Sequence, residues 1–273
     1  MVFPRPLLIF LLGVNLSLGA EKPEFLFLVG EYEYGTRESL PEFAEKNLKP
    51  KGYKTKFVFA ESDDRADAGC HEFPGLKKAL DGADVLVIST RRRFPPKEEM
   101  AMIREWIADG KPVVGIRTAS HAFAAREKGK GYTTPEGHES WQNIDTEFFG
   151  AKYEGHFPGS TDAETFVRVS EGSENHVLLK GTKWKKPKKV KTSLYKNREL
   201  VADADVVLEG FVASGESEPL AWTRERDEQR IFYTSLGGVD DFNEEWFQRV
   251  MLNALEWAAG MNAPGKRPAL EKR

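Results

Sequence analysis

The chain has 273 residues, with 40 lysines and arginines against 43 aspartates and glutamates, and a formal net charge of −3 at pH 7. This balance argues against a nucleic-acid-binding protein, which would normally be basic. The single cysteine, Cys70, excludes an internal disulfide, so a chain of this length must be stabilised by packing of its own core.

Residues 1–20 have the pattern of a secretory signal peptide. Arg5 precedes the apolar run LLIFLLGV, which ends in the small residues SLGA before the charged EKPE. The run is too short for a membrane span, and no later run approaches the roughly 18 apolar residues that a span needs. We therefore expect cleavage after Gly19 or Ala20, no membrane insertion, and an exported protein, periplasmic or extracellular.

Apolar strands and amphipathic helices alternate through the first half of the mature chain. Continuous apolar runs indicate buried strands, and apolar residues at helical spacing indicate the helices between them. Strands are predicted at 25–30, 54–60, 83–90 and 111–117, and helices at 38–48, 73–80 and 95–111. This alternation predicts parallel βαβ units in a doubly wound sheet.

The pattern changes from about Tyr132. A polar loop precedes a short predicted helix that ends at Gly150, and further strands are predicted at 164–170, 204–211, 218–225 and 229–236, before a final helix at 243–260. The lysine-rich KWKKPKKVK (183–191) is interpreted as a solvated loop, with an anionic surface partner as the alternative. We expect one folded domain over 24–260 and a frayed tail over 261–273.

Ligands of open α/β sheets bind beyond the carboxyl ends of the strands, where the strand order reverses. For a strand order 2-1-3-4, the loops after the first, third and fourth strands meet there. These loops read GEYEYGTRE, TRRRFPP and RTASHAF, and all three are rich in polar residues. The sequence therefore predicts a site at this edge of the sheet.

The first and third loops supply candidate catalytic and binding residues. Glu31 and Glu33 are candidate general bases and Tyr34 a pocket residue, although a solvated loop with aromatic packing is equally compatible with the pattern. Neighbouring residues of an extended segment point in opposite directions, so at most two of the three consecutive arginines should serve one site. Arg91 and Arg92 are the candidates for holding an anionic or hydroxyl-rich ligand.

The fourth loop lies in KPVVGIRTASHAF, which is typical of a strand, a sharp turn and the start of a helix. Many α/β enzymes carry a nucleophile at such a turn. An unpaired charge at the end of a buried strand is costly, so Arg117 should pair with Glu31 or Glu33 or with a ligand, unless it forms a purely structural salt bridge. Ser120 is expected to cap the helix, which is the ordinary role of a serine where a helix begins. A nucleophilic serine would need a base in reach, and His121, as the adjacent residue, rarely has that geometry. His121 itself is a candidate catalytic residue.

The other histidines show no H-E-x-x-H or similar metal-binding spacing. His156, in YEGHF, follows a glycine turn and can reach back over the sheet as a ligand-binding residue, and Tyr195, in SLYK, can contribute to a lid. No cofactor is expected. Zinc or another divalent metal held by His121, His156 and a glutamate is the alternative.

Five segments of the chain together resemble the trehalose-utilisation (ThuA-like) family. They are ADVLVISTRRRFPPKE, IADGKPVVGIRTASHAF, YEGHF, SLYK and the stretch from EPLAWTRERDEQRIFYTSLGGVDDF to FQRVMLNALEWA. The resemblance is collinear from about Phe25 to Ala259. It implies a flavodoxin-like core of the class I glutamine amidotransferase type, with additional C-terminal strands and a final helix, and a role in sugar utilisation.

The departures from the family patterns bear on the chemistry. The amidotransferase elbow reads G-[IV]-C-x-G, and aligning GIRTAS places Arg117 at the cysteine, so amidotransfer from glutamine is excluded. Many ThuA-like proteins have a histidine at that position, so a metal site of relatives would lose a ligand here. His156 matches a family histidine, whereas Gly238 replaces another. Asp241, in the DDF that follows, is a further candidate for substrate binding.

These residues and the resemblance predict a protein that acts on a sugar or an oxidised sugar derivative, as a small molecule or oligosaccharide. Lyase, isomerase or hydrolase chemistry would use Glu31 or Glu33 as the base, and Arg117 or an arginine of 91–93 to stabilise an enolate or carboxylate. The alternatives are a non-catalytic module that binds glycans or a partner protein and, third, a metal-dependent hydrolase. Whether the chain forms a homo-oligomer stays open.

Overall fold

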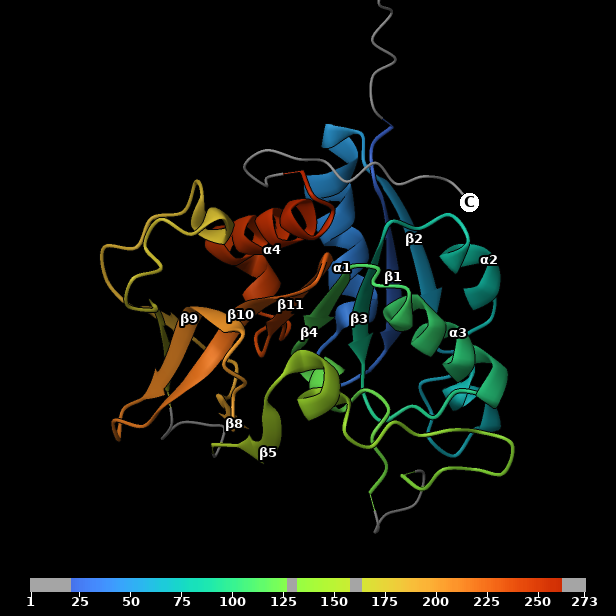
Figure 1. The fold of residues 1–273 in the computed structure, drawn as a ribbon. Helices are drawn as coiled ribbons and strands as arrows, with labels where there is room; N and C mark the ends of the chain where they lie inside the picture. Colours follow the sequence, from blue (N-terminus) through green and yellow to red (C-terminus); the bar gives the residue numbers. More distant parts are fainter. Residues whose placement is uncertain (1–20, 127–131, 158–163, 262–273) are drawn as a thin grey trace, which may run out of the picture.

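The computed structural model describes residues 21–126, 132–157 and 164–261. The expected signal peptide and nearly all of the expected tail lie outside the described residues. Within them, no helix is both long enough and apolar enough to cross a membrane. The described part is a large twisted sheet with helices on both faces (Figure 1).

Strands and helices alternate in the first half as β1 (Glu24–Gly30), α1 (Thr36–Phe43), β2 (Lys54–Phe59), α2 (Leu76–Leu80), β3 (Val85–Thr90), α3 (Lys97–Ala108) and β4 (Val113–Ile116). The second half is mostly strands. They are β5 (Lys152–His156), β6 (Thr165–Val169), β7 (Lys188–Val190), β8 (Tyr195–Arg198), β9 (Ala204–Val212), β10 (Ser217–Arg226) and β11 (Gln229–Thr234), followed by the last helix, α4 (Glu245–Ala258).

The main sheet has nine strands in the order β2-β1-β3-β4-β11-β10-β9-β6-β7. Neighbouring strands from β2 to β11 are parallel, and the pairs from β11 to β7 are antiparallel. β5 and β8 form a separate antiparallel pair. The doubly wound, mostly parallel core with the order 2-1-3-4 and the additional C-terminal strands are therefore confirmed.

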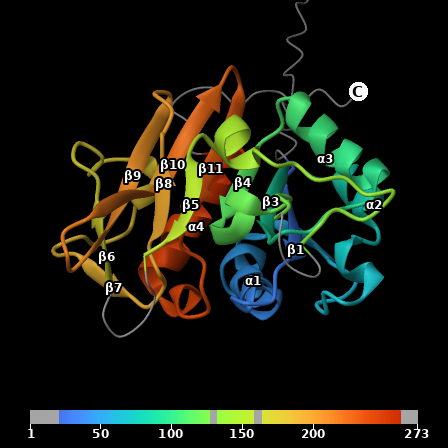
Figure 2. The same cartoon turned by 90° about the horizontal axis from the view of Figure 1, so that it is seen from below.

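Two apolar layers hold the sheet, one on each face. Phe25 and Phe27 of β1 pack with α1 and α4, whereas Leu26 and Leu28 pack with α2 and α3. The figures show the same arrangement of helices (Figures 1 and 2). Because both faces are covered, a central strand has no polar side, which is why these strands read as continuous apolar runs.

Several elements differ from the prediction. Helix α1 starts at Thr36 and ends at Phe43, where a wider π-helical turn over Ala44–Leu48 takes over. The helices predicted after β4 and before Gly150 are single turns, η4 (Arg117–His121) and η5 (Asp145–Phe149).

The short strands β5, β7 and β8 were not predicted. The solvated-loop interpretation of 183–191 is wrong for β7, which forms the edge of the main sheet. An edge strand leaves one side exposed, and lysine is well suited to that position. Short polar strands of this kind lack the apolar pattern on which the prediction relied.

Gly115 allows η5 to lie directly on the sheet. A Cβ atom at this position would lie 2.4 Å from Cε1 of Phe149, the last residue of η5. The missing side chain therefore sets the distance between β4 and the turn that begins at Asp145. Asp145 and Thr146 of that turn line the candidate site.

We predict that Gly115→Ala lowers the free energy of unfolding by about 1–3 kcal/mol, because the added methyl group overpacks the contact with Phe149. Urea denaturation measures the change. Gly82→Ala is the control, because a Cβ there would meet only the side-chain ends of Lys56 and Glu24. Equal stability losses in the two variants would contradict the close-approach explanation.

Candidate functional site

The three predicted loops meet at the carboxyl end of the parallel strands. The backbone N–H of Arg91 donates to Gly30 O at 3.2 Å, and that of Arg92 donates to His121 O at 3.2 Å. The loop after β3 is thus bonded to both the end of β1 and the turn after β4, and Arg91 also forms an ion pair with Glu33 in the loop after β1. The predicted convergence of the loops is confirmed.

The turn after β4 has the expected elbow shape. The strand ends at Ile116, and Arg117, the first residue of η4, adopts a left-handed backbone conformation with φ of 44°. Such a conformation costs a long side chain of the order of 1–3 kcal/mol, so the surroundings must hold it in place. Tyr233 contributes by donating its hydroxyl to Arg117 O at 2.7 Å. The tip of the elbow therefore carries a cation, whose side chain turns into the protein.

The guanidinium of Arg117 points inward and is only 2% exposed. It donates to Ser235 O at 2.8 Å and to the Ser193 hydroxyl at 3.1 Å. The rings of Tyr34 and Tyr195 lie 4.2 and 4.4 Å from its central carbon, as cation–π contacts. The expected pairing with a glutamate of the first loop is therefore wrong, because carbonyl and hydroxyl oxygens and aromatic faces compensate the charge.

Glu31 holds the first loop together. Its buried carboxylate accepts the backbone N–H of Tyr34 at 2.8 Å and of Thr36 at 2.9 Å, and it also accepts the Thr36 hydroxyl. Glu33 lies further out and forms an ion pair with Arg91 at 2.9 Å. The structure thus separates the two glutamates, giving one a structural role and pairing the other with a loop arginine.

Asp241 plays a similar part in the loop after β11. The buried Oδ2 accepts the backbone N–H groups of Gly237 at 2.8 Å and Gly238 at 2.9 Å, and the Thr192 hydroxyl at 2.6 Å. This carboxylate is directed into the backbone and is absent from the lining of the pocket described next. It fixes the loop that supports Arg117.

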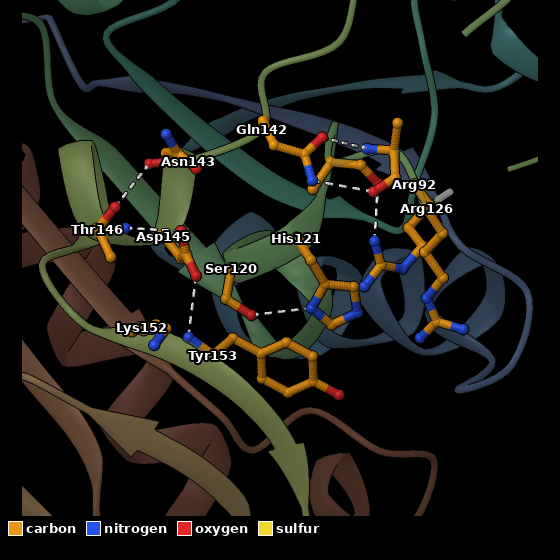
Figure 3. Close-up of a pocket in the computed structure, with 12 residues that line it drawn as sticks. Arg92, Ser120, His121, Arg126, Gln142, Asn143, Asp145, Thr146, Lys152 and Tyr153 are labelled. Atoms are coloured by element: carbon orange, nitrogen blue, oxygen red, sulfur yellow. Dashed lines mark hydrogen bonds between the residues drawn. The ribbon is translucent and has the colours of Figure 1, made fainter. Parts of the chain in front are cut away.

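A pocket of about 470 Å³ opens beside η4, where Figure 3 shows its lining side chains. The elbow turn, η5 and β5 contribute its walls. The lining residues are Arg92, Ser120, His121, Ala124, Ala125, Arg126, Gln142, Asn143, Asp145, Thr146, Lys152 and Tyr153. Of the predicted site residues, only Arg92 and His121 belong to this set.

His121 is the central side chain of the pocket wall. Its ring stacks on Tyr153 with 4.3 Å between centroids, and Nδ1 lies 3.0 Å from Ser120 Oγ (Figure 3). Burial, followed by the positive charges of Arg92 and Arg91, lowers the pKa of His121 well below its usual value. The imidazole is therefore neutral at physiological pH.

Ser120 does not cap a helix. It lies inside the tight turn η4, where the adjacent His121 comes within hydrogen-bond distance. The expectation that His121 would not lie within reach of Ser120 is wrong, because a tight turn and not the start of an α-helix brings the two adjacent side chains together.

Strands β5 and β8 support the stacked ring. The centroids of Tyr153 on β5 and Tyr195 on β8 lie 4.6 Å apart, so Tyr195 stands between the pocket wall and Arg117. His156 is exposed at the end of β5, and its Nδ1 lies 2.8 Å from Phe157 O. Tyr34, Tyr195 and His156 thus surround the pocket wall without lining the pocket.

The sequence reasoning missed most of the lining. Tyr153 precedes His156 in the quoted YEGHF, and recognising β5 would have drawn attention to it. Asp145 lies in the predicted short helix, and burial raises the pKa of its carboxyl group. Arg126 and Lys152 had no pattern to single them out, because they come from segments without regular periodicity.

Metal ligands do not gather in the described residues. No group of three histidine, cysteine, aspartate or glutamate side chains among residues 21–126, 132–157 and 164–261 is arranged to hold a metal ion. Within that part of the chain, His121 and His156 therefore do not join a glutamate in the zinc site that was the alternative in the sequence analysis.

A protein-family model described as trehalose utilisation, ThuA, matches residues 28–258. The chain belongs to the ThuA family. A solved ThuA-like protein from Parabacteroides merdae ATCC 43184 is similar over 91% of this chain and 94% of that one, with a TM-score of 0.57 and 15% identity. At this identity the similarity shows the shared fold alone.

Larger proteins contain a similar unit. A β-galactosidase from Rahnella sp. R3 has a TM-score of 0.53 at 11% identity, and the carbohydrate deacetylase Agd3 has a TM-score of 0.52 at 12% identity. The match to the β-galactosidase covers 88% of this ThuA-family chain, and the match to Agd3 covers 86% of it. Each match covers only 32% of the larger protein. No curated protein matches the chain.

We predict that Glu31→Gln lowers the free energy of unfolding by roughly 1–3 kcal/mol, because the amide group leaves a buried N–H donor without its acceptor. Glu33→Gln is the matched control. Loss of its partly exposed ion pair should cost at most about 1 kcal/mol. Chemical denaturation of both variants measures the difference, and a more damaging Glu33→Gln would contradict the structural role of Glu31.

We predict that His121 stays neutral as the pH falls through about 6.5, where an exposed histidine takes up a proton. Because the unfolded chain binds this proton and the folded chain does not, the free energy of unfolding should decrease below that pH. NMR of the histidine ring protons, assigned with His121→Asn, measures the titration. The acid-induced loss of stability should be smaller in His121→Asn, and a His121 titration near pH 6.5 would contradict the prediction.

Proposed function

We propose that the pocket binds a sugar or an oxidised sugar derivative that carries a keto or carboxylate group. The observation that carries the proposal is the combination, in one pocket, of the neutral stacked ring of His121 with the cations of Arg92 and Arg126. Membership of a family described by trehalose utilisation supports a carbohydrate as the ligand. The signal peptide expected at residues 1–20 supports a ligand outside the cytoplasm.

The pocket offers different groups for different parts of such a ligand. Arginine can bind a carboxylate or an enolate oxygen through two N–H groups, and Arg126 is exposed enough to do so. The ammonium of Lys152 and the amide of Asn143, also in the lining, can serve the hydroxyl groups of the sugar. The size of about 470 Å³ lies within the range usual for small-molecule sites.

His121 is the proposed base in place of Glu31 and Glu33, whose carboxylates bond within the loops. The Ser120 hydroxyl lies 3.4 Å from Arg117 O, so it can donate to that carbonyl while its oxygen accepts a hydrogen bond from the N–H of His121 Nδ1. In this tautomer His121 Nε2 carries a lone pair. It can then take a proton from the carbon beside a keto group, and the arginines stabilise the enolate that forms.

A non-catalytic sugar-binding module is the second candidate. The observation that favours it is the engagement of two candidate carboxylates, those of Glu31 and Asp241, in buried backbone contacts. With both carboxylates committed to structure, the pocket has fewer groups for acid–base chemistry than the sequence suggested. Binding without proton exchange would identify this function.

The test is incubation of the purified protein in D₂O with a panel of disaccharides, sugar acids and 3-keto sugars. Mass spectrometry reports deuterium exchange or turnover, and calorimetry reports binding. We expect Arg126→Ala to weaken binding roughly tenfold, as for loss of a charged hydrogen bond. We expect His121→Asn to bind but not to exchange.

Arg168→Ala is the matched control, because Arg168 is a partly exposed arginine on β6, outside the lining of the pocket. It should bind and exchange as the unmodified chain does. Binding without exchange in the unmodified chain would support the binding module over the enzyme. Neither binding nor exchange across the whole panel would contradict the proposed function.

A further inference from the structure

A second hollow, of about 630 Å³, lies at the far end of the main sheet from β2. Its walls come from β6, the segment before β7, β7 itself and the start of α4, and Figure 2 shows β6 and β7 at that end of the sheet. The lining residues are Phe166, Lys183, Lys185, Lys186, Pro187, Lys188, Lys189, Glu244 and Trp246. None of them lines the pocket beside η4.

The charge of this hollow is opposite to that of the chain. Five of its lining residues are lysines and one is a glutamate, whereas the whole sequence has a net charge of −3. Lys189 forms an ion pair with Glu164. For Lys183, Lys185 and Lys186, the described residues provide no ion pair. Like charges repel when they are held together, so this arrangement creates a local positive potential that attracts anions.

Two aromatic residues, Phe166 and Trp246, belong to the lining of the hollow, and Trp184 packs against Trp246 without belonging to that lining. The rings of Trp184 and Trp246 meet edge to face with 5.1 Å between centroids, and Lys188 Nζ lies 5.2 and 5.7 Å from them. These cation–π contacts hold one ammonium group in place. The hollow therefore combines exposed ammonium groups, those of Lys183, Lys185 and Lys186, with a partly aromatic lining.

Protection of the sheet edge explains only part of the arrangement. Lysines on an exposed edge strand prevent unwanted strand pairing, which accounts for Lys188 and Lys189 on β7. Lys183, Lys185 and Lys186 precede the strand and cannot serve that purpose. Their concentration beside a concave aromatic surface indicates a ligand.

The surroundings favour a polymeric sugar among the anionic partners. A membrane-binding surface needs exposed apolar side chains, but the exposed large hydrophobic residues of the described chain are Tyr32, Val239 and Met261, none of them in this hollow. The acidic balance of the sequence argues against nucleic acid. A groove with an aromatic wall suits an acidic polysaccharide, because the face of a sugar ring can pack against an aromatic ring while charged groups recur along the polymer.

We propose that this hollow binds an acidic polysaccharide, one that carries carboxylate or sulfate groups, at a site separate from the pocket beside η4. The rim lysines bind the anionic groups, and the aromatic lining residues, Phe166 and Trp246, contact the sugar faces. This site would hold a polymer on the protein whether or not the pocket at the carboxyl end of the parallel strands acts on sugars.

The experiment titrates the full chain with polygalacturonate, dextran sulfate and neutral dextran, by calorimetry and tryptophan fluorescence, at low and at physiological salt. The test variant carries Lys183→Gln, Lys185→Gln and Lys186→Gln. The matched control, with Lys77→Gln, Lys78→Gln and Lys97→Gln, loses the same charge at exposed positions outside the hollow.

We expect at least one acidic polysaccharide to bind, more weakly at higher salt, and neutral dextran not to bind. The test variant should bind roughly tenfold more weakly, since three surface charge contacts are lost, and the control variant should be unchanged. Binding of polygalacturonate or dextran sulfate alone would identify the anionic group. Arg126→Ala, which tests the pocket beside η4, should bind both polymers normally, so the two proposals can fail separately.

Three outcomes would overturn the proposal. The first is equal polysaccharide binding by the test variant and the unmodified chain. The second is an equal loss in the control variant, which would indicate a response to net charge alone. The third is tighter binding to double-stranded DNA or to phosphatidylserine vesicles than to either acidic polysaccharide, which would assign the hollow to another class of partner.

Discussion

The burial of the Arg117 charge is the constraint on which the rest of the site depends. A guanidinium removed from water must regain its lost interactions within the protein, or the fold loses several kcal/mol. Here Ser235, Ser193 and the rings of Tyr34 and Tyr195 supply them. These groups come from the end of β11, the start of β8 and the first loop, so one side chain fixes three segments against the elbow.

The remaining charges follow from this arrangement. Glu31 and Asp241 each bond to backbone N–H groups of loops that carry or border the partners of Arg117. These two carboxylates are thus committed to loop structure. Arg92 and Arg126 keep a positive field at the pocket, and this field adds to burial, the larger cause, in lowering the pKa of His121.

Much of the fold could be predicted because burial on both faces leaves a plain signal in β1, β3 and β4. The strand order then located the site, since parallel strands place their carboxyl ends at one edge. The partners of Arg117 could not be predicted, because aromatic faces compensate a charge without leaving a charge pattern in the sequence. The contact between Ser120 and His121 also depends on the tight turn η4, which looks like the start of an α-helix in sequence.

The separation of β5 from the main sheet bears on how a ligand would enter. In the described chain β5 pairs with β8 alone, and β8 is tied to β10 through bonds from Asn197 to Glu218 and Pro219. An isolated two-stranded sheet is marginally stable, so its outer strand should open at a lower free energy than the core. Tyr153, the platform under His121, lies on that outer strand. The wall of the pocket can therefore loosen while the nine-stranded sheet remains folded.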